Sequence, residues 1–121
     1  MASIDIADGV LRVELRLWDK ILAVHGSLHI PLAHIIEARS EIAPPVPWFS
    51  KIIGTNFPGV KAAGTFFTSD GLAFYDYGSG AECLVLDLDH ETYKLAVIEI
   101  DMPDSAVAAA HRIATAIGTQ D

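Results

Sequence analysis

Residues 60–77, VKAAGTFFTSDGLAFYDY, decide the fold class of this chain. Two apolar and aromatic runs flank Asp70 and Gly71, and this dipeptide is a strong signal for a two-residue hairpin because both central positions of such a turn favour positive φ. We therefore predict antiparallel strands over 60–68 and 72–77. Gly64 interrupts the first of these runs, which indicates either a bulge or a close approach of another backbone.

The segment upstream of this hairpin also has the pattern of strands. Residues 10–17, VLRVELRL, alternate apolar and charged side chains, which is typical of a half-buried strand. A short turn at 18–20 leads into 21–30, so this second strand runs antiparallel to the first. Pro31 ends it, and residues 35–42 are predicted to form a third strand.

Two more strands and one helix complete the prediction. Residues 83–89 and 93–100 are predicted to be strands, and the residue composition changes at Asp101. The following sequence is rich in alanine and begins with capping-type residues, which predicts a helix over about 103–117. Its expected apolar stripe is Val107, Ala110, Ile113, Ala114 and Ile117.

The predicted order is seven strands joined as meanders, over about residues 10–100, followed by the C-terminal helix. Seven short antiparallel strands curl into a barrel or split into two packed sheets, and the helix must bury its stripe against them. We therefore expect a mainly β barrel or sandwich capped by a C-terminal helix. The length of 121 residues fits one domain, spanning residues 1–121.

Composition restricts the class of partner. Hydrophobic residues make up 51% of the chain and mean hydropathy is +0.36, which predicts that another chain covers part of an apolar surface. The net charge of −8 disfavours nucleic acid and anionic lipid headgroups, because both need a positive field. The single cysteine, Cys83, suits a reducing compartment. We found no signal peptide and no apolar run long enough to span a bilayer, so we expect a cytoplasmic protein.

Residues 44–59, PPVPWFSKIIGTNFPG, are the candidate interaction segment. Their prolines argue against a helix or a central strand, and their apolar side chains argue against a solvent-exposed loop that makes no contacts. Three interpretations are open: the segment covers a mouth of its own barrel, docks on another protein chain, or enters a membrane interface. The side chains predicted to make the contact are Trp48, Phe49, Ile52, Ile53 and Phe57.

Candidates for catalysis or metal binding are weak by comparison. The histidines at 25, 29 and 34 do not follow a recognised zinc-binding spacing. Asp87, Asp89 and Glu91 alternate, but the glycine and glutamate that a calcium loop requires do not follow them. Cys83 lies among apolar residues, which favours a core position over a nucleophile. We therefore predict no catalytic residue, no metal ligand and no cofactor.

The order of elements resembles a pleckstrin-homology-like (PH-like) domain, and most closely the small bacterial PH-like domains of unknown function. The resemblance spans residues 9–118 and is carried by VELRLWDKILAV (13–24), IPLAHI (30–35), GTFF (64–67) and the last strand running into the DMPD-started helix. It implies a binding module and not an enzyme. Lipid-binding members carry several basic residues in the first hairpin loop. Here that loop is Trp18-Asp19-Lys20, which argues against phosphoinositide binding.

The predicted function is thus a non-catalytic module for protein interaction or self-assembly. The alternative is a small-molecule-binding protein or small enzyme that uses the barrel mouth, lined by aromatic residues such as Phe66, Phe74 and Tyr75. A pocket above about 300 Å³ with converging polar groups would favour a ligand. An Asp–His or Cys–His pair within about 3.2 Å in a cleft would favour an enzyme.

Overall fold

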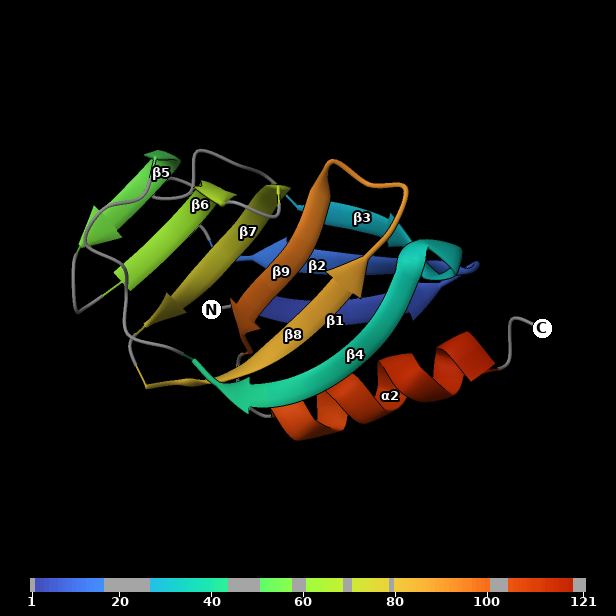
Figure 1. Cartoon of the computed structure of the whole chain (residues 1–121). Helices are drawn as coiled ribbons and strands as arrows, with labels where there is room; N and C mark the ends of the chain where they lie inside the picture. The colour runs from blue at the N-terminus through green and yellow to red at the C-terminus, as the bar shows by residue number, and fades with distance from the viewer. Residues whose placement is uncertain are drawn as a thin grey trace.

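The structure is a computed structural model that describes residues 2–16, 27–43, 51–57, 61–68, 71–78, 80–100 and 105–118. Within these residues the chain forms nine strands in two sheets, one short 3₁₀ turn and the helix α2 (Figure 1). The predicted mainly β fold with a single C-terminal helix is therefore confirmed. The described strands pack as a sandwich and do not close into a barrel.

The smaller sheet contains three antiparallel strands in the order β1-β2-β3. They are β1 (Ala2–Ala7), β2 (Val10–Leu15) and β3 (Leu28–Pro31). β1 was not among the strands predicted from sequence. Asp8 and Gly9 join β1 to β2 with φ values of 53° and 74°, which is the positive-φ hairpin geometry that an Asp-Gly dipeptide favours.

The larger sheet contains six strands in the order β4-β8-β9-β7-β6-β5. The strands are β4 (Ile35–Ile42), β5 (Lys51–Phe57), β6 (Lys61–Thr68), β7 (Gly71–Gly78), β8 (Glu82–Leu88) and β9 (Tyr93–Glu99). The 3₁₀ turn η1 (Leu32–His34) connects the two sheets.

The predicted meander is wrong for the last strands. The β8–β9 hairpin turns back so that β9 lies between β8 and β7, and β9 runs parallel to β7. The sequence of β9, YKLAVIE, suits this central place because Ala96, Val97 and Ile98 are all buried. Consecutive residues of a strand point to opposite faces of the sheet, so side chains on both faces of β9 are buried here.

The main core lies between the two sheets and under the helix. Leu11 and Val13 of β2 meet Leu84 of β8, Ile98 of β9 and Ile113 of α2 in one buried cluster. In Figure 1 the three-stranded sheet lies behind β8 and β9, and α2 runs below β4. One face of the large sheet is thereby covered at its β4, β8 and β9 end.

The helix α2 (Ala106–Gly118) matches the predicted span closely. Ser105 caps it, because the amide of Ala108 donates to Ser105 Oγ at 3.1 Å. The predicted stripe is partly wrong. Val107 and Ala114 are exposed and Ile117 is only partly buried, whereas the buried residues of the helix are Ala106, Ala109, Ala110 and Ile113. The small alanines let the helix backbone lie close to the sheet.

The hairpin predicted around Asp70 and Gly71 is present and consists of β6 and β7. Thr68 pairs with Gly71, so Gly71 is the first residue of β7, with φ 126°, and not a central position of the turn. Gly64 lies opposite Gly54 of β5 without a register shift. Gly64 therefore marks a close approach of two backbones, and not a bulge.

Candidate functional site

The interaction segment predicted from sequence contributes an edge strand. Trp48 and Phe49 lie outside the described residues, as do the rest of 44–50 and 58–60. Ile52 and Phe57 belong to β5, although their side chains lie outside the description. Ile53 is 54% exposed. The prediction that 44–59 is a long connection without a strand is wrong for Lys51–Phe57, which form the outermost strand of the large sheet.

The β5 end of the large sheet reaches beyond the second layer. Figure 1 shows β5 and β6 extending to the left of the three-stranded sheet. The register places Lys51 opposite Phe67 and Ile53 opposite Thr65, so Ile53 and Phe67 share one face. Phe67 is 45% exposed. We call these two residues the Ile53–Phe67 patch.

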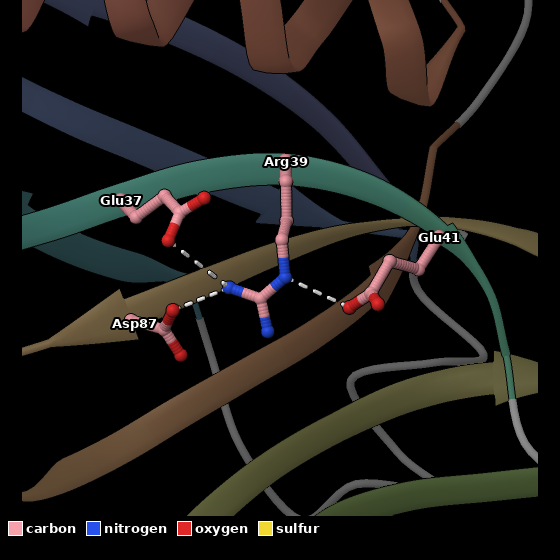
Figure 2. Close-up of polar contacts among 4 residues, drawn as sticks. All are labelled: Glu37, Arg39, Glu41 and Asp87. Atoms are coloured by element: carbon pink, nitrogen blue, oxygen red, sulfur yellow. Dashed lines mark hydrogen bonds and ion pairs between the residues drawn. The ribbon is translucent and has the colours of Figure 1, made fainter.

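The opposite edge of the sheet, β4, is charged. Arg39 lies among three carboxylates, those of Glu37, Glu41 and Asp87 (Figure 2). Its Nε donates to Glu41 Oε2 at 2.9 Å, and its Nη1 donates to Asp87 and lies 3.9 Å from Glu37 Oε2. Burial lowers the pKa of Arg39, but its bonds to Asp87 and Glu41 outweigh that effect and raise the pKa overall. Charged side chains on an edge strand discourage pairing with another chain.

A cavity of about 350 Å³ opens on the face of the large sheet that turns away from the three-stranded sheet. Val85, Val97 and Tyr75 are register partners across β8, β9 and β7 and line this cavity together. Arg39, Glu41 and Tyr77 add polar groups to its lining. The cavity exceeds the size set above for a ligand site, and it lies on an open sheet face, not in a barrel mouth.

A buried ion pair joins β6 to β7 near the outer strand. Lys61 Nζ lies 2.9 Å from Asp76 Oδ1. The Asp76 side chain is fully buried, and Lys61 is largely buried. Lys61 is also the register partner of Phe57 in β5, so the pair anchors the strand that supports the exposed edge.

A histidine–carboxylate contact meets the distance set above for an enzyme. His34 Nδ1 lies 2.5 Å from Glu91 Oε2, and the amide of Asp89 donates to the carbonyl of His34 at 2.8 Å. A cavity of about 290 Å³ is lined by Glu91, Ser27 and His29 but not by His34. The Ser27 hydroxyl donates to Glu14 and not to an imidazole. The contact therefore fixes the β8–β9 turn onto η1.

The alternating carboxylates do not converge. Asp87 bonds Arg39, Asp89 lies 3.0 Å from His90 Nδ1, and Glu91 bonds His34. Among the described residues, no group of three or more histidine, cysteine, aspartate or glutamate side chains is arranged to hold a metal ion. His25 lies outside the described residues, and His29 is in β3, opposite Arg12.

Cys83 is fully buried in the second apolar cluster, beside Phe66 and Val97. Burial first, and then the charges of Glu99 and Asp76, raise the pKa of its thiol to about 12. Because the thiolate is the reactive form, we expect the native protein to resist Ellman's reagent at pH 8 and to react fully in denaturant. Rapid reaction in the native state would contradict this burial.

Comparison with protein-family models, with curated proteins and with solved structures found no match to this chain. The PH-like resemblance therefore stays a prediction. None of the helices in the described part of the chain has the length and apolar character needed to cross a membrane.

Proposed function

We propose that this chain is a non-catalytic interaction module that pairs with a second copy of itself through β5. The observation that carries the proposal is the character of this edge: Lys51–Phe57, KIIGTNF, is the outermost strand and contains a single charge. An edge strand presents backbone N–H and C=O groups that another strand can bond. The PH-like resemblance, which implies a binding module, agrees with this role, and the single cysteine is consistent with a cytoplasmic location.

A second copy is the partner that this edge fits best. Around a two-fold axis at Gly54, antiparallel β5 strands place Lys51 opposite Phe57 and Ile53 opposite Thr55. The two lysines then never face each other, so no like-charge pair opposes association. Such an isologous contact closes as a dimer and does not extend into a fibre. The charged β4 edge would not support the same pairing.

The Ile53–Phe67 patch adds apolar surface beside the paired backbones. Ile53 is 54% exposed in the single chain, so covering its exposed part contributes about 0.8–1.5 kcal/mol, half of the value for a fully exposed isoleucine. The same side chain occurs twice in a symmetric dimer. The high apolar content of the sequence is consistent with a surface that a partner covers.

Ile53→Lys tests the proposal. The substitution removes the apolar contact and places a lysine on the edge, which is a common natural protection against strand pairing. We expect the dimer dissociation constant, measured by sedimentation equilibrium, to rise by at least about 10-fold, since two isoleucine contacts of about 0.8 kcal/mol or more each are lost.

Val107→Lys is the matched control, because Val107 is as exposed as Ile53 but lies on α2. It should leave the dissociation constant unchanged. An equal rise of the dissociation constant in both variants would show that non-specific contact between exposed apolar side chains, and not the β5 edge, drives association.

A further inference from the structure

We propose that the cavity on the outer face of the large sheet is a binding site for a small apolar molecule that carries a hydrogen-bond acceptor and no negative charge. The site is independent of the β5 edge. Its volume of about 350 Å³ falls within the range of small-molecule pockets. Its lining comes largely from β4, β7, β8 and β9, which are hydrogen-bonded to one another in the large sheet.

The wall of the cavity suits a flat, apolar ligand. Val85 and Val97 are buried and share the floor. Tyr75 and Tyr77 stand on the same face of β7, with ring centroids 5.4 Å apart in an edge-to-face arrangement. Aromatic faces and edges of this kind bind planar rings and attract positively charged groups.

The Tyr77 hydroxyl is the reason why the ligand should carry a hydrogen-bond acceptor. Its side chain is completely buried, and its hydroxyl has no hydrogen-bond partner in the described part of the chain. A buried hydroxyl without a partner is a destabilising feature that a bound group can relieve. Burial raises the pKa of Tyr77 to about 12, so at neutral pH the hydroxyl is protonated and can donate to a ligand carbonyl or ether.

The rim determines the charge of the ligand. Arg39 and Glu41 line the cavity, but the guanidinium of Arg39 already contacts Glu37, Glu41 and Asp87 (Figure 2). Three carboxylates around one cation leave an excess of negative charge. The net charge of the chain, −8, acts in the same direction. An anionic ligand would be repelled here, whereas a neutral or cationic one would not.

Two fluorescent naphthyl probes test the site. Prodan is an uncharged ketone, and 1-anilinonaphthalene-8-sulfonate is an anion of similar size. We expect saturable prodan binding and at least tenfold weaker binding of the sulfonate. Tyr77→Phe retains the ring and removes the hydroxyl, so it should weaken prodan binding about fivefold, which is the contribution of one hydrogen bond. The melting temperature of the unliganded variant should stay the same or rise.

Tyr93→Phe is the control. The Tyr93 hydroxyl shares a 2.7 Å hydrogen bond with Thr65, and Tyr93 lies outside this cavity. This variant should melt lower than the parent and bind prodan equally well. Absence of prodan binding, or loss of binding only in Tyr93→Phe, would overturn the site. Equal binding of the sulfonate that also depends on Tyr77 would overturn the ligand class. None of these outcomes bears on pairing through β5.

Discussion

Phe74→Ala is expected to lower the free energy of unfolding by about 3 to 5 kcal/mol, the usual cost of removing a buried phenylalanine ring. Phe74 is fully buried in the main core, and its ring packs edge-on against Tyr93 with 5.6 Å between centroids. It lies on β7 between Thr65 of β6 and Ala96 of β9. The loss would leave a cavity at the junction of the outer and central strands.

Urea unfolding at a fixed low protein concentration measures this effect. Phe67→Ala provides the matched control, because it makes the same chemical change on the neighbouring strand at a position that is 45% exposed. We expect it to cost less than about 1 kcal/mol in the single chain. Similar losses for the two variants would contradict the placement of Phe74 in the core.

Lys61→Met is expected to lower the free energy of unfolding by about 3 kcal/mol. The substitution keeps much of the apolar stem but removes the ammonium group that lies 2.9 Å from the buried Asp76 carboxylate. Removing one partner of a buried ion pair costs about 3–5 kcal/mol, because the other charge stays buried without that partner. We choose the lower end of that range because Lys61 itself is partly exposed.

The double variant Lys61→Met, Asp76→Asn separates charge from packing in the same urea experiment. It replaces the carboxylate with a neutral amide of the same shape, so it should recover much of the stability that Lys61→Met loses. A double variant less stable than Lys61→Met would show that Asp76 contributes mainly through other contacts.

Local patterns predicted the elements better than their arrangement. The alternation in 10–17 and the alanine-rich stretch after Asp101 led directly to β2 and α2, because each pattern reflects a single buried face. The parallel pairing of β9 with β7 was missed, since it joins strands separated along the chain by a complete β8 and depends on which strand fits the centre of the sheet. Asp8-Gly9 carried the same turn signal as Asp70-Gly71 and would have revealed β1.

The candidate sites were predictable only in part. The uncharged run around Ile53 was visible in the sequence, but its position at the sheet edge depends on the pairing of β5 with Lys61–Thr68. Tyr75 and Tyr77 alternate, so a shared face was foreseeable. The missing hydrogen-bond partner of Tyr77 is a property of three-dimensional packing, and so is the gathering of Glu37 and Asp87 around Arg39 (Figure 2).

The molar mass of the unmodified chain in solution tests the central claim most directly. Light scattering behind a sizing column, over a wide range of protein concentration, distinguishes one chain of 13.0 kDa from a symmetric pair. Pairing through β5 predicts a mass that rises with concentration to twice the single-chain value and then stays constant, because an isologous contact closes. A single-chain mass at every concentration would contradict self-assembly, and a mass that keeps growing would contradict the closed two-fold contact.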